Sequence, residues 1–235
     1  MDHVDHSVDL VVPIKRLDRA KSRLRGAVAG PHAELVLALL LDTVSAAAGA
    51  DGVRRVLVVC EDARVPAALR GTGVECVDER GLPGLNAALS FGADVLRERD
   101  PHGVVGALQA DLPALRTADL AAAVAAAGGR RAFCPDRAGT GTTLLLSAPG
   151  APLGPRFGTG SARAHADSGA VEIGVETASL RCDVDTAGDL AAAVRLGLGP
   201  RTASLAGATG QETGTSPDRS NEGRPLAGNC WTMRL

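Results

Sequence analysis

The feature that most constrains the fold is a regular alternation of short apolar runs with longer segments rich in Ala and Leu. The apolar runs are expected to be strands, at Val8–Ile14, Arg55–Cys60, Val74–Val77, Val104–Gln109, Ala132–Cys134, Thr142–Leu146 and Val171–Val175. The Ala- and Leu-rich segments are expected to be helices, at Ala33–Ala48, Ala63–Leu69, Leu85–Arg99, Ala118–Ala127 and Ala187–Leu196. This alternation predicts an α/β domain with a mostly parallel sheet covered by helices on both faces.

One strand is expected to break the parallel pattern. Thr142–Leu146 follows Ala132–Cys134 too closely for a helix to lie between them, so these two strands should pair in the antiparallel direction. In open sheets of this kind, ligands bind outside the carboxyl ends of the parallel strands. We therefore look for functional residues directly after the strands.

The 235-residue chain is predicted to hold one domain. Residues 8–199 contain all the alternating segments, and residues 1–7 form a short N-terminal extension. Residues 200–235 are rich in Gly, Ser, Thr, Pro and Asn and show no apolar periodicity. That composition predicts a disordered tail.

Composition excludes several function classes. Lys and Arg together number 25 against 27 for Asp and Glu, and aromatic residues make up 2% of the chain, so neither counterion release nor base stacking favours nucleic acid as a partner. No apolar run approaches the roughly 20 residues that cross a bilayer, so we expect no membrane partner. The N-terminus lacks a secretory pattern, which predicts a cytoplasmic protein. Five scattered cysteines suit neither a disulfide framework nor a zinc site, and we interpret them as small inert hydrophobes.

A cationic loop follows the first predicted strand. Lys15, Arg16, Arg19, Lys21 and Arg23 lie within nine residues of the strand end, at the position where an α/β sheet would hold a polyphosphate. Neither the dinucleotide-binding nor the P-loop glycine pattern is present. From charge alone, a solvated basic turn is an equally good interpretation.

Acidic residues follow two later segments. Asp111 comes directly after Val104–Gln109, where a carboxylate could bind Mg²⁺ or simply make a turn before Pro113. Asp183 and Asp185 alternate around one residue, so an extended backbone puts both on one face. Two neighbouring carboxylates favour a bound cation, and we therefore prefer a site for metal and phosphate at Asp111, Asp183 and Asp185.

Two segments rich in Gly and hydroxyl side chains complete the set of candidates, Gly139–Leu144 and Arg156–His165. Their glycines would let backbone N–H groups approach a phosphate or carboxylate, and the second segment opens a short predicted helix. Each pattern also occurs in ordinary loops. His165 is interpreted as a structural histidine, because no Ser or Cys nucleophile accompanies it.

Taken in order, these segments resemble one family, the phosphoenolpyruvate / 2-phospho-lactate guanylyltransferases of deazaflavin coenzyme F-420 biosynthesis. The resemblance covers about Val8 to Leu196. It rests on Pro13-Ile14-Lys15, Lys21-Ser22-Arg23-Leu24, Gly84-Leu85-Asn86-Ala87-Ala88, Asp111-Leu112-Pro113, Gly141-Thr142-Thr143, Phe157-Gly158-x-Gly160-Ser161-Ala162-x-x-His165 and Asp183-Val184-Asp185-Thr186-x-x-Asp189-Leu190. Related nucleotidyltransferases usually carry a Gly-rich loop where this chain has Pro13-Ile14-Lys15.

The resemblance implies a Rossmann-like, three-layer α/β/α nucleotidyltransferase fold of the GT-A type. It also implies transfer of GMP from GTP to the phosphate of a three-carbon acid, with release of pyrophosphate. The cofactor that it implies is Mg²⁺. The implied roles are as follows: Asp111, Asp183 and Asp185 hold the metal; Lys15, Lys21, Arg23, Gly84 and Asn86 bind the nucleotide; Thr143, Gly158 and Ser161 bind the acid; and Asp111, Lys15 and Arg23 act in catalysis.

The residues agree with this chemistry because a phosphate oxygen that attacks phosphorus is already ionised near neutral pH and needs no general base. Two alternatives remain: a nucleotidyltransferase acting on a molybdenum-cofactor precursor or a sugar phosphate, and a non-catalytic nucleotide-binding regulator. The sequence does not choose between phosphoenolpyruvate, 2-phospho-lactate and 3-phosphoglycerate, and oligomeric state stays open. The expected product would pass to a downstream deazaflavin transferase.

Overall fold

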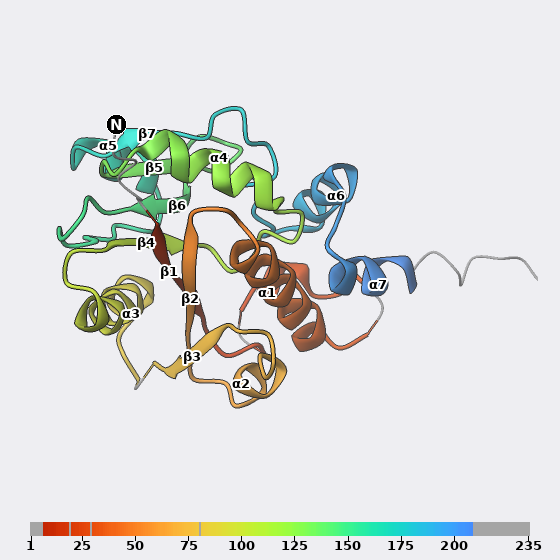
Figure 1. The fold of residues 1–235 in the computed structure, drawn as a ribbon. Helices are drawn as coiled ribbons and strands as arrows, with labels where there is room; N and C mark the ends of the chain where they lie inside the picture. Colours follow the sequence, from red (N-terminus) through yellow and green to blue (C-terminus); the bar gives the residue numbers. More distant parts are fainter. Residues whose placement is uncertain (1–6, 19, 29, 80, 209–235) are drawn as a thin grey trace, which may run out of the picture.

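A computed structural model describes residues 7–18, 20–28, 30–79 and 81–208 (Figure 1). The strands are β1 (Val8–Ile14), β2 (Val53–Cys60), β3 (Glu75–Asp78), β4 (Val104–Leu108), β5 (Ala132–Pro135), β6 (Thr142–Leu146) and β7 (Val171–Glu172). The helices are the short 3-10 turn η1 (Ser22–Leu24) and α1 (His32–Ala48), α2 (Arg64–Ala68), α3 (Leu85–Arg99), α4 (Thr117–Ala127), α5 (Ser161–Asp167), α6 (Ala187–Leu196) and α7 (Pro200–Ala208). The predicted alternation of strands and helices is confirmed.

The strands form one seven-stranded sheet in the order β3-β2-β1-β4-β6-β5-β7. β6 pairs antiparallel with both β4 and β5, whereas the other neighbouring strands pair in parallel. Both the mostly parallel sheet and its antiparallel departure were predicted. The strand order reverses between β1 and β4, and a crevice at such a reversal is the usual ligand position in this architecture.

Helices cover both faces of the sheet. α3 lies on one side of β1 and β2, and α1 lies on the other (Figure 1). All seven residues of β1 are buried, because Leu10 and Val12 pack into the core beneath α1 whereas Val11 packs against α3. A strand buried on both faces reads as a continuous apolar run, which is the pattern that β1 shows in the sequence.

A third core cluster anchors the loop that follows β1. Leu24 and Val28 pack with Leu35 and Leu39 of α1 and with residues of α6. Leu24 is 1% exposed, so η1 is fixed to the domain although the segment around it is rich in charge. This packing holds the cationic loop over the carboxyl edge of the sheet.

The sequence-based prediction for residues 200–235 is wrong at its start. Pro200–Ala208 form α7, and the Asp42 carboxylate in α1 accepts hydrogen bonds from the backbone N–H groups of Arg201 (3.2 Å) and Thr202 (2.8 Å). Asp42 thus satisfies donors at the helix start that have no partner within the helix. Residues 209–235 of the predicted tail and residues 1–6 of the predicted extension lie outside the described residues.

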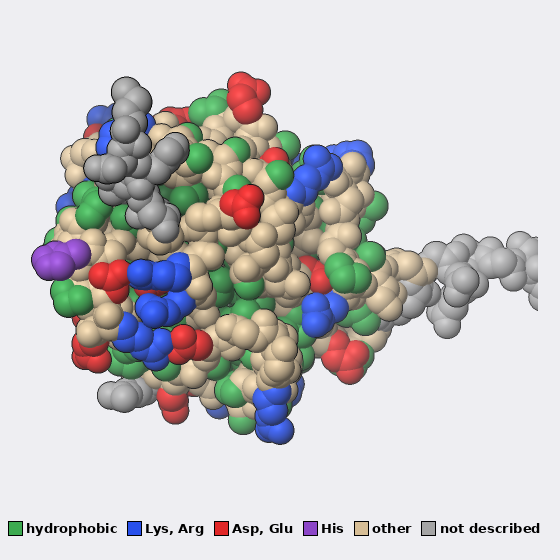
Figure 2. Space-filling model, in the orientation of Figure 1, with side chains coloured by type: hydrophobic (Ala, Val, Ile, Leu, Met, Phe, Trp, Pro, Cys, Tyr) green, Lys and Arg blue, Asp and Glu red, His purple; other side chains and the backbone are tan. Residues whose placement is uncertain are grey.

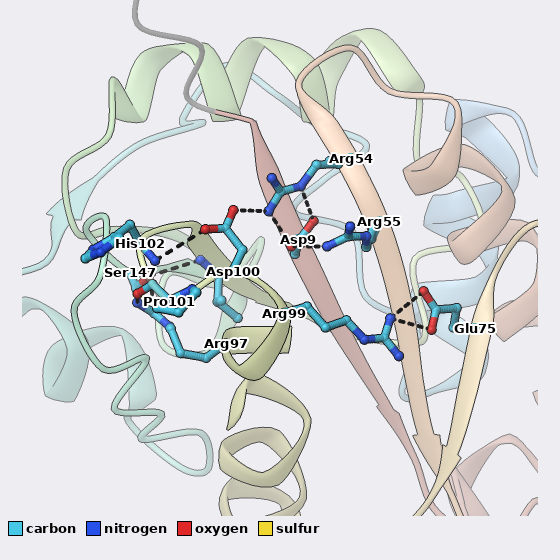
Figure 3. A network of polar contacts seen from close by, with 11 residues as sticks. Asp9, Arg54, Arg55, Glu75, Arg97, Arg99, Asp100, Pro101, His102 and Ser147 are labelled. Carbon is cyan, nitrogen blue, oxygen red and sulfur yellow. Dashed lines mark hydrogen bonds and ion pairs between the residues drawn. The ribbon is translucent and has the colours of Figure 1, made fainter. Parts of the chain in front are cut away.

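An ionic network closes the opposite, amino-terminal edge of the sheet (Figure 3). Asp9 in β1 is 1% exposed, and its carboxylate accepts from Arg54 Nε at 2.9 Å and Nη2 at 2.6 Å. Arg54 also bonds Asp100 after α3 at 2.6 Å, and these carboxylates raise the pKa of the Arg54 guanidinium. Figure 2 shows basic and acidic side chains side by side on this face, over β1 and β2.

The part of the chain that the structure describes has no helix long and apolar enough to cross a bilayer.

Candidate functional site

Two acidic segments meet at the carboxyl edge of the sheet. Asp111 follows β4, and the backbone N–H of Val184 donates to the backbone carbonyl of Asp111 at 3.0 Å. This bond lies between Asp183 and Asp185, so it places both of them next to the end of β4. A capping box in which Thr186 and Asp189 bond each other's backbone N–H then begins α6 and orients the segment.

Lys21 joins these two segments. Its ammonium contacts Asp111 Oδ2 directly and lies 2.5 Å from Asp185 Oδ1. The Lys21 side chain is 20% exposed and that of Asp111 is 7% exposed, so this pair is better shielded from water than a surface ion pair. The backbone of Lys21 has a φ of +52°, a left-handed conformation that costs a residue other than glycine about 1–2 kcal/mol.

The carboxylates outweigh the cation at this point. Burial raises the pKa of Asp183 to about 6, an effect that Lys21 opposes and Asp185 reinforces. Asp111 Oδ1 is buried and has no hydrogen-bond partner among the described residues. An unpartnered carboxylate oxygen beside two more carboxylates suits a hard divalent cation.

Metal binding by Asp111, Asp183 and Asp185 stays a prediction. Within the described ranges, no group of three or more His, Cys, Asp or Glu side chains is arranged to hold a metal ion. The physical reason is visible in the contacts, because the Lys21 ammonium lies between Asp111 and Asp185. Sequence spacing places the carboxylates on one edge but does not show which cation lies among them.

A cavity of about 180 Å³ opens beside this cluster. Its polar lining comes from Lys15, Lys21, Gln109 and Asp111, and its apolar lining includes Leu85 at the start of α3. The cavity therefore lies between the ends of β1 and β4, where the strand order reverses. Three of the residues predicted from the sequence, Lys15, Lys21 and Asp111, line it together.

The predicted nucleotide residues Gly84 and Asn86 have specific structural tasks. Gly84 precedes α3 with a φ of +86°, which favours glycine. Asn86 Nδ2 donates to the backbone carbonyl of Phe157 at 3.0 Å, and Asn86 Oδ1 accepts from the Phe157 N–H at 2.8 Å. The Asn86 amide thus holds the loop that leads to Gly158, and its contact with a nucleotide stays a prediction.

The two Gly-rich segments lie next to each other in the structure. The N–H of Ala162 donates to the carbonyl of Thr140 at 3.1 Å, which ties the start of α5 to the loop before β6. Gly158 has a φ of +134°, and a Cβ atom built there would meet open space. Ser161 begins α5 and is 2% exposed.

Thr143 lies at the start of β6, beside the end of β4. Its carbonyl accepts from the Gln109 N–H at 2.9 Å, and its buried hydroxyl donates to the Cys134 carbonyl at 3.4 Å. Because β6 runs antiparallel, its first residues reach the carboxyl edge of the sheet. Thr143 therefore lies on the ligand side, although its hydroxyl has an internal acceptor.

His165 is structural, as the sequence indicated. The ring is fully buried, its Nε2 accepts from the Arg156 N–H at 3.0 Å, and its Nδ1 lies 2.9 Å from Thr142 Oγ1. Burial and the nearby Arg131 and Arg156 lower its pKa to about 4. The imidazole supports the backbone around the Gly158 loop in its neutral form.

Arg23 is exposed on η1, and no hydrogen bond or ion pair joins it to another described residue. Sequence reasoning overlooked Asp62, which follows β2 and accepts from the Leu17 N–H at 3.1 Å and from the Arg64 guanidinium. Arg64 lowers the pKa of this carboxyl group. Asp62 positions the cationic loop, and its place after a strand end was the available signal.

The fold and this site define a nucleotidyltransferase-type α/β domain. Its fold is similar to the solved structure of a 4-diphosphocytidyl-2C-methyl-D-erythritol synthase, with a TM-score of 0.55 at 14% identity, over 81% of this chain and 99% of that one. The chain belongs to the family described as "Guanylyl transferase CofC like", which it matches over residues 8–203.

Two relatives support this assignment at much higher identity. A protein of Salinispora arenicola named phosphoenolpyruvate guanylyltransferase is 51% identical over 211 residues, covering 88% of this chain and 97% of that protein. A protein of Streptomyces coelicolor with the same name is 52% identical, covering 84% of this chain and 94% of the other. The family resemblance read from the sequence is confirmed.

Proposed function

We propose that this chain transfers GMP from GTP to the phosphate of phosphoenolpyruvate, producing enolpyruvyl-diphosphoguanosine and pyrophosphate. Membership of the guanylyl transferase family supports the reaction class, and the names of relatives about half identical to this chain support the substrates. The observation that carries the proposal is the joining of Lys21, Asp111 and Asp185 at the strand-order reversal. 2-Phospho-lactate is the alternative acceptor of the same chemistry.

In the proposed reaction, an oxygen of the acceptor phosphate forms a bond to the α-phosphorus of GTP, and the bond from that phosphorus to the bridging oxygen of pyrophosphate breaks. The acceptor is already an anion, so the site must position two anions and offset their charge. The buried His165, with its pKa lowered to about 4, is not a base for this step. Lys15, Lys21 and Arg23 supply the cationic side.

We assign Asp111, Asp183 and Asp185 to a divalent metal, with Mg²⁺ as the expected ion. The unpartnered Asp111 Oδ1 and the excess of carboxylates over the single Lys21 ammonium fit such an ion. When bound, Mg²⁺ would neutralise charge on the phosphates of the nucleotide. Lys21, whose side chain also lines the adjoining cavity, would then exchange its carboxylate partners for phosphate oxygens.

Thr143, Gly158 and Ser161 are assigned to the acceptor acid. Gly158 leaves open space where a side chain would lie, and the bond between Ala162 and Thr140 keeps the two segments adjacent. Backbone N–H groups there would bind the phosphate or carboxylate of the acid. Lys15 and Arg23 would stabilise the leaving pyrophosphate.

The test measures pyrophosphate release with each nucleoside triphosphate, Mg²⁺ and each of three acids: phosphoenolpyruvate, 2-phospho-lactate and 3-phosphoglycerate. We expect release only with GTP and phosphoenolpyruvate together. Release with a molybdenum-cofactor precursor or a sugar phosphate instead would favour the other nucleotidyltransferase classes. No release with any acceptor, despite GTP binding, would favour a non-catalytic regulator.

The product is a reactive diphosphate ester, so the proposal includes a deazaflavin transferase of coenzyme F-420 biosynthesis as the enzyme that consumes it. Both proposed substrates are metabolites of the cytoplasm, and the reaction is assigned there. Adding that downstream enzyme to the assay should increase total turnover if it removes the product directly.

A further inference from the structure

A second cavity, of about 430 Å³, lies at the ends of β2 and β3. It is lined by Lys15, Arg16, Glu61, Glu79, Gly81 and Leu82. Lys15 also lines the smaller cavity beside Lys21 and Asp111. Lys15 thus lies between the two cavities, and a ligand with two chemically different ends could extend past it to occupy both.

Glu79 is the unusual residue of this second cavity. It is 6% exposed and lines the cavity, yet no described residue donates a hydrogen bond to its carboxylate. Its backbone is fixed at both ends, because its N–H donates to the Cys60 carbonyl at 2.9 Å and its carbonyl accepts from the Leu82 N–H at 3.3 Å. The side chain is thus held in the cavity wall.

The environment of Glu79 calls for hydrogen-bond donors. Burial raises the pKa of its carboxyl group, the neighbouring Glu61 raises it further, and Lys15 opposes the shift. The carboxylate oxygens are not fully enclosed and open onto the cavity, but partial removal from water without donors still costs free energy. A ligand that brought two N–H groups would remove this cost.

We propose that Glu79 selects guanine, by accepting hydrogen bonds from the N1–H and the N2 amino group of the base. Arg16, which also lines this cavity, would donate to O6 on the same edge. This inference rests on the proposed function, which supplies GTP as the nucleotide. The base would occupy the 430 Å³ cavity, and the phosphates would extend past Lys15 toward Lys21.

The charges favour this direction over the reverse one. In the larger cavity Glu61 and Glu79 offset the charges of Lys15 and Arg16, whereas in the smaller one Lys15 and Lys21 outnumber the single carboxylate of Asp111. Adenine presents an acceptor at N1 and no amino group at C2, so it would leave the carboxylate without donors. A site built to hydrogen-bond a group discriminates strongly against a ligand that lacks it.

The experiment compares binding of GTP, ITP and ATP by isothermal titration calorimetry, in the presence of Mg²⁺ and without acceptor acid. ITP lacks only the N2 amino group. We expect the unmodified protein to bind GTP at least tenfold more tightly than ITP, and ITP more tightly than ATP. In Glu79→Gln, we expect GTP affinity to fall at least tenfold while ITP affinity falls much less.

Glu75→Gln is the matched control. Glu75 begins β3 and Glu79 directly follows that strand, but the Glu75 carboxylate pairs with Arg99 outside the cavity. Its removal changes the same net charge and should leave the GTP:ITP ratio unchanged. Because the Glu79 carboxylate has no partner among the described residues, Glu79→Gln should also leave the melting temperature unchanged or raise it.

Equal binding of GTP and ITP to the unmodified protein would overturn the proposal, and so would an unchanged GTP:ITP ratio in Glu79→Gln. If Glu79→Gln does not fold, Glu79→Asp tests the same point, since it keeps the charge and should retain the preference for GTP at reduced affinity. Selective GTP binding without pyrophosphate release would sink the proposed function alone. If Glu79→Gln releases pyrophosphate from GTP and phosphoenolpyruvate as the unmodified protein does, with the same preference for GTP over ITP, only this inference is overturned.

Discussion

The Lys21 ammonium forms a direct ion pair with Asp111 across the carboxyl edge of the sheet. A cation from the first loop thus occupies carboxylates that we assign to a divalent metal. The left-handed backbone of Lys21 and the anchored Leu24 behind it hold the side chain in this position. Metal binding and lysine pairing should therefore compete in the absence of nucleotide.

Lys21→Met tests this competition. Without nucleotide, the variant should bind Mg²⁺ several-fold more tightly than the unmodified protein, because the carboxylates lose a competing ammonium. GTP affinity should instead fall about tenfold, since one phosphate-binding cation is lost. Calorimetric titration of each ligand measures both effects. Weaker Mg²⁺ binding in the variant would contradict the competition.

Asp111→Asn should abolish turnover and keep the fold, because it removes the charge of a proposed metal ligand without changing side-chain size. Asp183→Asn and Asp185→Asn should each lower turnover as well. The larger decrease should mark the carboxylate that contacts the metal directly, and the smaller one a carboxylate that acts through another residue. Pyrophosphate release and circular dichroism measure the two properties. Asp51→Asn, in an exposed turn before β2, is the control and should be silent.

Thr143→Ala and Ser161→Ala should each raise the KM for phosphoenolpyruvate by about ten- to a hundredfold, since a hydrogen bond to a charged ligand contributes roughly 1.5–3 kcal/mol. The KM for GTP should stay nearly unchanged. Gly158→Val should have a larger effect, because the φ of +134° disfavours a β-branched residue. A change confined to the KM for GTP would mean that the two halves of the site are reversed.

The buried His165 predicts a pH dependence of stability. Its pKa in the folded protein is about 4, below the ordinary 6.5, so between these values the unfolded chain binds more protons. The free energy of unfolding should therefore fall as the pH decreases from 6.5 toward 4, at up to roughly 1.4 kcal/mol per pH unit. Urea unfolding measures it. His165→Gln should flatten this slope, and His102→Gln, at an exposed histidine, should not.

A chain that ends at Gly199 should be less stable than one that ends at Ala208, by about 1–3 kcal/mol. The shorter chain leaves the buried Asp42 carboxylate without the N–H groups of Arg201 and Thr202. Thermal unfolding of the two chains isolates the contribution of α7, since they differ only there. Equal stability would mean that solvent replaces these bonds at no cost.

Local patterns predicted most of the fold. The bounds of α3 and α6 agree with the periodicity of their own residues, and β1 agrees with its apolar run. The helix α7 was missed because its first N–H groups are satisfied by Asp42, which lies about 160 residues away in the chain. No pattern within residues 200–208 contains that information.

The candidate site was predictable as a set of strand ends but not as a set of contacts. Asp111 and Asp185 were expected at one edge, yet the Lys21 ammonium between them depends on a left-handed turn that no glycine marks. Asn86 was expected near the nucleotide, and the bonds of its amide to the Phe157 backbone could not be predicted from the sequence. Glu79 was overlooked, since a glutamate among charged residues after a strand is typical of a solvated surface.

The reversed direction of β6 has a consequence for how such enzymes can diversify. Because β6 begins at the ligand edge, the hairpin between β5 and β6 delivers Thr143 beside β4 without passing through the nucleotide-facing loops. The segment proposed to meet the acceptor thus lies, in the chain, between the loops proposed to bind the nucleotide and the Asp183–Asp185 segment. Exchanging that hairpin and the Gly158 loop between homologues should change the specificity for the acceptor acid without changing the specificity for the donor nucleotide.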